Sequence, residues 1–293
     1  MADTTHTWLG TTSGDWATAS NWTPAGPPAA ANAAAVIDGN ATAAITGSDQ
    51  SATTLDTLRI KASNTYAVGS ASTKLKIGVT DCYLHEPSQG TVPGSGAGRI
   101  NLQLSTAGAC NVYVLGSSNT STDTGKEPIR ICGGNATTSV YVSGPARLGL
   151  ATDTPADTMT LNLLEVTSTG ANVTLGEGAT WVDIQQTGGN ITVNTSGQTI
   201  GVYGGTLTLQ NGATANTVTV AGKLILSERT EATTNTFTSL TIMPGGELVL
   251  NNVIYVGAVT IHKGGKVSFI RGDTFPILGA TITPVDAASI SVN

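Results

Sequence analysis

Short runs of alternating apolar and polar residues follow one another along most of the chain. Alternation with a period of two is typical of strands that bury one face. Gly, Pro, Asn or Ser bounds each run, as expected for the turns between strands. In the first half the runs predict strands at residues 55–60, 74–77, 99–104, 111–115, 129–132, 139–142 and 160–164. No helical period of apolar residues accompanies them, so the pattern predicts an all-β chain.

A unit of two short strands recurs in the second half, between residues 172 and 269. Gly or Asn precedes the first strand of each unit, and a second strand lies between most of these first strands. Units of this size cannot bury an apolar face alone, so they are expected to stack on one another. Stacking would place one apolar residue of each unit in an inward column: Val173, Ile191, Leu207, Leu224, Leu248 and Val267.

This recurrence favours a parallel β-solenoid, most simply a right-handed β-helix. The alternative is an antiparallel sandwich or barrel, whose strands have a similar spacing. We expect three parts: an N-terminal attachment or capping segment at residues 1–60, a solenoid body at 61–270, and a C-terminal cap or arm at 271–293. The longest unit contains an insertion at residues 227–236, which should bulge from one corner.

The composition narrows the class of protein. Only 11% of the 293 residues are charged, and the formal net charge is −6. The 13 Lys and Arg residues are scattered and form no basic stripe, so nucleic acid is not an expected partner. No apolar run is long enough for a membrane-spanning helix, and residues 1–10 lack the features of a secretory signal. We therefore expect no membrane association, synthesis in a host cytoplasm, and release by a route other than secretion.

Three of the four tryptophans lie in a distinctive N-terminal string. It reads Trp8-Leu-Gly-Thr-Thr-Ser-Gly-Asp-Trp16, followed by Asn21-Trp22, Pro27-Pro28 and Val36-Ile37. This string resembles a pattern at the start of β-solenoid proteins of tailed bacteriophages and prophages, and of some autotransporter-like bacterial surface proteins. The resemblance is confined to this N-terminal string and implies a virion accessory protein, such as a head decoration protein or a spike. The missing secretory signal favours the phage proteins over the autotransporters.

The tryptophans have two compatible interpretations. They could cap the first rung of the stack and prevent end-to-end association. They could also bind a partner, because aromatic residues dominate many interfaces. We take Trp8, Trp16 and Trp22 as the candidate partner-binding residues. The expected partners are the major capsid protein or other virion proteins, and two further copies of the chain in a homotrimer.

No catalytic, metal or cofactor site is expected. Glycan cleavage needs two carboxylates about 5–10 Å apart. Asp183 should point outward, but the next rungs would place Gly201 or Tyr203, and then Thr219, at its position. His6, His85 and His262 share no motif. The three cysteines lack zinc-site spacing and are expected to be buried or half-buried thiols in a reducing compartment. The acids considered form no ladder: Asp153, Asp157, Glu165, Glu177, Asp183, Glu228, Glu231 and Glu247.

The sequence thus favours a non-enzymatic virion structural protein, a capsid decoration or spike protein, that attaches through its N-terminal segment. One alternative is a tailspike-like protein that binds or cleaves host glycans. Another is a bacterial surface adhesin.

Overall fold

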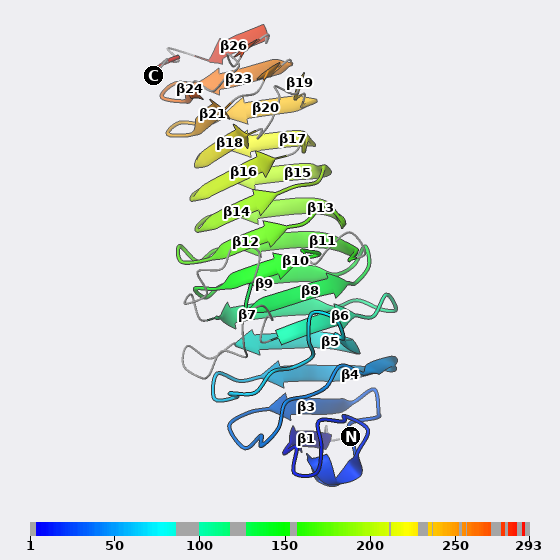
Figure 1. The fold of residues 1–293 in the computed structure, drawn as a ribbon. Coiled ribbons are helices and arrows are strands. Elements are labelled where there is room, and N and C mark those ends of the chain that lie inside the picture. Colours follow the sequence, from blue (N-terminus) through cyan, green and yellow to red (C-terminus); the bar gives the residue numbers. More distant parts are fainter. Residues whose placement is uncertain are drawn as a thin grey trace.

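The chain is an all-β protein built from parallel strands (Figure 1). The computed structural model describes residues 4–85, 100–117, 127–152, 157–210, 212–227, 237–251 and 257–270, and the short segments 234–235, 254–255, 277–278, 281–285 and 289–290. Within these residues the one helical piece is a 3-10 turn, η1 (Ala19–Asn21). The absence of α-helix agrees with the sequence pattern.

Most strands belong to two columns, in each of which every strand pairs in parallel with the next. The first column contains β1 (Thr4–Trp8), β3 (Ala33–Ile37), β4 (Asp49–Ile60), β5 (Leu75–His85), β7 (Asn111–Gly116), β9 (Ser139–Val142), β11 (Met159–Val166), β13 (Ala179–Gln186), β15 (Gly197–Val202), β17 (Ala215–Val220), β20 (Ser239–Ile242), β23 (Ala258–His262) and β26 (Thr281–Val285).

The second column starts from the first residues of β5, which pair with β6. It contains β6 (Ile100–Leu104), β8 (Ile129–Gly133), β10 (Arg147–Leu150), β12 (Asn172–Leu175), β14 (Asn190–Val193), β16 (Thr206–Gln210), β18 (Lys223–Ser227), β21 (Glu247–Asn251), β24 (Lys266–Ile270) and β27 (Ser289–Ile290). A small separate sheet joins β19 (Thr234–Asn235), β22 (Ile254–Tyr255) and β25 (Ile277–Leu278) in parallel. Beyond the columns, β2 (Trp22–Thr23) pairs antiparallel with β1.

The inward column predicted for the second half is confirmed. Its six residues are paired in register from β12 to β24, and each is at most 2% exposed: Val173, Ile191, Leu207, Leu224, Leu248 and Val267. The antiparallel alternative is wrong for the described strands, because every pairing between them except that of β1 with β2 is parallel.

The expected position of Asp183 is wrong by two residues. Ile184, not Val182, pairs with Ile200, so Asp183 lies opposite Thr199 rather than Gly201. The alternation in β13 is interrupted, because the two consecutive residues Val182 and Asp183 are both half-buried. The inward partner of Val202 is the polar Gln186, so matching apolar residues alone placed Val182 where Ile184 belongs.

The columns run through both expected segment boundaries. At the N-terminal boundary, β3 pairs with β4 and β4 pairs with β5 of the predicted body. Beyond residue 270, β26 pairs with β23 and β27 with β24, so this part supplies the last pair of strands. This part also contains β25, which pairs with β22 in the small sheet; its other residues, and most of the insertion at 227–236, lie outside the described residues.

Glycine allows the close turns between consecutive strands. Gly189 and Gly205 have φ values of 68° and 73°, which residues with a side chain rarely adopt. A Cβ on Gly205 would lie 2.3 Å from the carbonyl oxygen of Gly189, in the turn one rung earlier. The stacked turns therefore need glycine for both conformation and space.

Candidate functional site

The three N-terminal tryptophans form one buried cluster at the end of the stack. The Trp22 ring packs edge-to-face against Trp8 and Trp16, with ring centroids 5.1 and 4.6 Å apart. None of the three residues is more than 2% exposed. Trp8 Nε1 donates to the carbonyl of Ala43 and Trp22 Nε1 to the carbonyl of Trp16. The buried Trp16 Nε1 has no acceptor among the described residues.

Asn21 fixes the loop between the tryptophans. Its side chain is fully buried, and its Oδ1 accepts hydrogen bonds from the backbone N–H groups of Thr12 and Ser13. Its Nδ2 donates to the Ser13 hydroxyl and to the carbonyl of Asp15. Asn21 belongs to the N-terminal sequence pattern, but the sequence alone predicted no role for it. Its place beside Trp22 in that pattern was the available signal.

Other residues of the N-terminal pattern also have local structural roles. The Asp15 carboxylate accepts hydrogen bonds from Ala17 N–H and the Thr18 hydroxyl. Gly10 has a φ of 64°, and a Cβ on Gly14 would lie 2.7 Å from the Ala44 carbonyl oxygen. The pattern therefore defines how this end of the chain folds.

Because the three tryptophans are buried, their rings are not available for direct contact with a partner. In this conformation their rings pack against the chain itself, so the residues they hold at the surface are the ones available for contact. The exposed residues between Trp8 and Trp22 are Thr11, Thr12, Ser13, Asp15, Ala17, Ala19 and Ser20. The partner-binding role of this segment stays a prediction, with the tryptophans supporting the loop.

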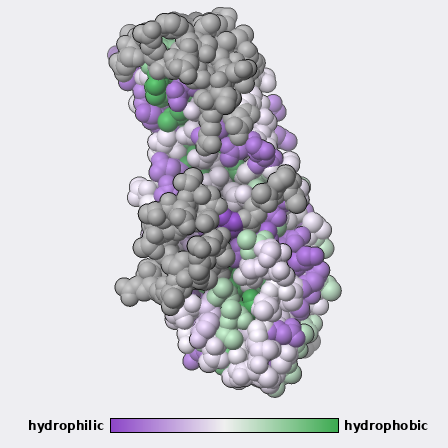
Figure 2. Space-filling model, in the orientation of Figure 1, coloured by the Kyte–Doolittle hydropathy of each residue, from purple (hydrophilic) through white to green (hydrophobic). Residues whose placement is uncertain are grey.

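The N-terminal end also differs from the rest in charge. Residues 1–58 contain five Asp and no Lys or Arg, whereas all 13 basic residues lie from Arg59 onward. Asp38 forms an ion pair with Lys61, which directly follows β4, and Asp49 forms one with Lys76 of β5. Figure 2 shows the lower, N-terminal end as mostly pale, with few strongly hydrophilic residues. Residues of intermediate hydropathy therefore dominate the visible face of this end.

Several carboxylates considered for catalysis are engaged locally. Both Asp183 oxygens accept hydrogen bonds from Gln185, and Asp157 forms an ion pair of 2.9 Å with Lys74. Glu247 lies between Lys223 and Lys266, at 3.4 and 3.2 Å. Asp153, Glu228 and Glu231 lie outside the described residues.

The cysteines are buried free thiols, as expected. Burial raises the pKa of Cys110 to about 12 and that of Cys132 to about 11, and it raises the pKa of Cys82 well above its ordinary value. Such thiols are poor nucleophiles, because the thiolate is the reactive form. Within the described part of the chain, no three His, Cys, Asp or Glu side chains gather as a metal site would require.

A stack of tyrosines on the first column was not foreseen. Tyr83, Tyr113 and Tyr141 occupy the same outward position on β5, β7 and β9. Their rings are nearly parallel, with centroids 4.8 and 5.2 Å apart, and the Arg59 guanidinium lies 4.4 Å from the Tyr83 centroid. The spacing of strands along a sheet therefore sets the spacing of the rings.

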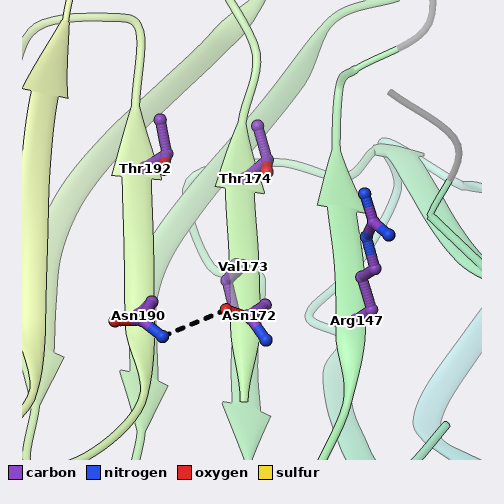
Figure 3. A pocket seen from close by; sticks show the side chains of 6 residues that line it. All are labelled: Arg147, Asn172, Val173, Thr174, Asn190 and Thr192. Carbon is purple, nitrogen blue, oxygen red and sulfur yellow. Dashed lines mark hydrogen bonds between the residues drawn. The ribbon is translucent and has the colours of Figure 1, made fainter. Parts of the chain in front are cut away.

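Two hollows on the outward surface are lined by described residues. The first, about 520 Å³, has the Lys74–Asp157 ion pair and the Asp49–Lys76 pair along its wall. The second, about 420 Å³, lies over three strands of the second column (Figure 3). Its lining residues are Arg147, Asn172, Val173, Thr174, Asn190 and Thr192.

Comparison with known proteins found no matching family model, no matching curated protein and no matching solved structure. Among the described residues, no helix is long and apolar enough to cross a membrane.

Proposed function

We propose that the two columns form a right-handed parallel β-solenoid that serves as a non-enzymatic structural protein of a phage virion. The solenoid is supported by the pairing of each strand with the strand two places further along, as β12 with β14 and β14 with β16. Right-handed connections between parallel strands of one sheet are strongly preferred, which supports the hand.

The observation that carries the virion role is the closed N-terminal end. Strand edges invite further pairing, so a stack of strands needs its ends blocked. Here β2 covers part of the β1 edge, and Pro24, which lacks an N–H, follows it directly. The loop that the Asn21 side chain holds in one conformation then presents a nearly uncharged surface of defined shape. Attachment to a capsid protein or another virion protein would use its hydrogen bonds and shape.

We further propose a homotrimer on the particle. Closed cyclic symmetry is the common arrangement of repeated protein contacts, and the low charge of the chain offers little repulsion to close packing. In solution, light scattering should give three times the mass of a single chain. The mass of a single chain at micromolar concentration would count against the trimer.

The attachment is tested on particles purified from the lysed source culture. Mass spectrometry should find the chain at a fixed copy number, and cryo-electron microscopy should place its N-terminal end on the particle. In vitro, Thr12→Lys in the exposed loop should reduce rebinding to stripped particles. Thr217→Lys, an equally exposed change far along the stack, should not. Full rebinding of the Thr12→Lys protein would contradict attachment through this loop.

A further inference from the structure

The tyrosine stack on the first column places three phenol rings on consecutive rungs. Tyr83, Tyr113 and Tyr141 are paired in register on β5, β7 and β9, so each ring lies beside a ring on the next strand. The ring centroids are 4.8 and 5.2 Å apart, and the ring planes differ by 14° in both pairs. The three side chains are half-buried, so each also reaches solvent. The sheet therefore orders the rings while leaving them accessible to small molecules.

Neighbouring phenols are groups that one-electron oxidation can join. A phenol that loses one electron and one proton becomes a phenoxyl radical, with much of its unpaired electron density on the ring carbons ortho to the oxygen. Two such radicals combine by forming a carbon–carbon bond between ortho carbons. The hydrogen on each bonded carbon then moves to the phenol oxygen, which restores both aromatic rings as dityrosine. For each new bond, two electrons pass to the oxidant and two protons pass to water.

The distances in the stack suit this bond. In a bonded pair of rings the centroids are separated by two ring radii and one carbon–carbon bond, which is only slightly less than the separations in the stack. The rings must turn about their Cβ–Cγ bonds to bring the ortho carbons together, and half-buried side chains are less confined in this rotation than core residues. Because strand pairing already holds the rings side by side, the coupling is intramolecular and gains the rate advantage of a preorganised reaction.

Two tyrosines outside the stack separate the effect of geometry from that of exposure. Tyr66 and Tyr203 are 38% and 51% exposed, more than the half-buried rings of the stack. Among the described residues, neither ring contacts another tyrosine ring. If exposure alone decided the reaction, oxidation would join these two tyrosines between separate molecules. If geometry decides it, oxidation joins the stack within one chain.

We propose that the tyrosine stack is an oxidative crosslinking site, at which a diffusible one-electron oxidant, such as the carbonate radical or a ruthenium(III) complex, joins Tyr113 to Tyr83 or Tyr141. Each oxidant accepts one electron, so two are consumed for each bond. The bond would tie two consecutive rungs whose strands are far apart in the sequence. It should stabilise the fold by restricting the unfolded chain, as a disulfide does. The proposal is independent of the virion role, because it concerns the chain alone.

The test oxidises the full chain in dilute solution. The protein is illuminated with a ruthenium(II) tris-bipyridine complex and persulfate, which together generate the ruthenium(III) oxidant. We expect dityrosine fluorescence in a product that still migrates as a single chain on a denaturing gel and whose mass is lower by two hydrogen atoms. Mass spectrometry of the digested product should place the bond between the Tyr113 peptide and that of Tyr83 or Tyr141. The thermal unfolding midpoint of the crosslinked chain should rise.

Tyr113→Phe is the decisive variant, because it keeps the ring but has no phenol O–H to lose. It leaves Tyr83 and Tyr141 two rungs apart, about 10 Å, and should abolish nearly all of the crosslink within one chain. Tyr83→Phe keeps one pair of phenols and should lose only part of the crosslink. Tyr203→Phe, the matched control outside the stack, should leave the crosslink within one chain unchanged.

Circular dichroism would check that each variant is folded. The proposal is overturned if Tyr113→Phe gives as much crosslink within one chain as wild type, or if dityrosine forms only between chains through Tyr66 or Tyr203. A crosslinked chain that unfolds at or below the temperature of the untreated chain would also contradict it, since the bond would then strain the two rungs.

Discussion

The first column changes its outward side chains along its length, although its inward ones hardly change. One inward position reads Leu58, Cys82, Val112 and Val140 from β4 to β9, and Ile200, Val218, Leu240 and Val259 from β15 to β23. The next outward position reads Arg59, Tyr83, Tyr113 and Tyr141 in the early rungs, and Gly201, Thr219, Thr241 and Thr260 in the late ones.

This difference separates two requirements on the sequence. An inward residue must be apolar and of limited size, because the columns enclose it on all sides. An outward residue has only to suit a strand and its neighbours one rung away. The early rungs meet the second requirement with stacked rings, and the late rungs meet it with β-branched threonines. The comparison predicts that substituting an inward residue lowers the free energy of unfolding equally in the early and late rungs. Substituting an outward residue should lower it by different amounts in the two regions.

The largest effect should come from inward leucines, and it should be the same in both regions. Leu84 on β5 and Leu224 on β18 are both fully buried. Changing either to Ala should lower the free energy of unfolding by about 2–5 kcal/mol, through lost burial and a residual cavity. Urea unfolding followed by circular dichroism measures this cost. Thr208→Ala, an outward change on β16, is the control. A cost below about 1 kcal/mol at one leucine alone would show that the two regions differ inside as well as outside.

The next effect concerns Gln186, a polar residue in an inward position. It pairs with Val166 and Val202, and it is fully buried. Its Nε2 donates to the carbonyls of Gly188, Gly189 and Thr206, while its Oε1 has no hydrogen-bond partner in the described chain. Gln186 thus holds the stacked glycine turns together.

Replacing Gln186 by Val, the residue on both neighbouring strands, would leave those carbonyls without this donor. We expect a loss of about 1–3 kcal/mol in unfolding free energy. Gln185→Val, at the adjacent half-buried position, is the matched control and should cost less. If Gln186→Val instead raised the stability, apolar packing would outweigh the turn contacts.

The tyrosine stack of the early rungs should stabilise the fold more than the threonines at the same outward position in the late rungs. Tyr113 contacts a ring on each side, so Tyr113→Ala should cost about 1–3 kcal/mol from two lost stacking contacts. Thr219→Ala, at the equivalent late position, should cost less than about 1 kcal/mol. Tyr113→Phe should keep most of the stability, since it retains both ring contacts. Equal costs for the two alanine changes would show that the stack adds nothing beyond strand preference.

Residue spacing explains which of these features could be predicted. The late units recur at short and similar intervals, so the register of Val173 with Ile191 and Leu207 was readable from alternation alone. Successive tyrosines of the stack are separated by longer stretches, with long connections between their strands, and no short period links them. The strand β10 was missed because Gly149 interrupts its pattern. The Arg147 hollow depends on that strand, so its residues could not be grouped before the pairing was known.

The smallest effect concerns ion pairs, one in each region. Asp49 in the early region has a side chain 58% exposed, whereas that of Glu247 in the late region is 24% exposed. A hydrogen bond from Ser268, at 2.6 Å, lowers the pKa of Glu247 below its ordinary value, and Lys266 and Lys223 add to this. A carboxylate whose pKa is lower in the folded than in the unfolded state stabilises the fold above the unfolded value. That contribution is lost as the pH falls through the native value.

Glu247→Gln should therefore destabilise the chain at pH 7 and have less effect at pH 3, because the contribution of the charged carboxyl declines as the pH falls towards its lowered native pKa. The stability difference between the two proteins, measured by urea unfolding at both pH values, should shrink as the pH falls. Ser268→Ala should reproduce part of this dependence by removing the main cause of the lowered pKa. Asp49→Asn should show a smaller difference at every pH, because water screens an exposed pair. A constant difference between wild type and Glu247→Gln from pH 7 to pH 3 would mean that packing of the side chain, not its charge, stabilises this part of the stack.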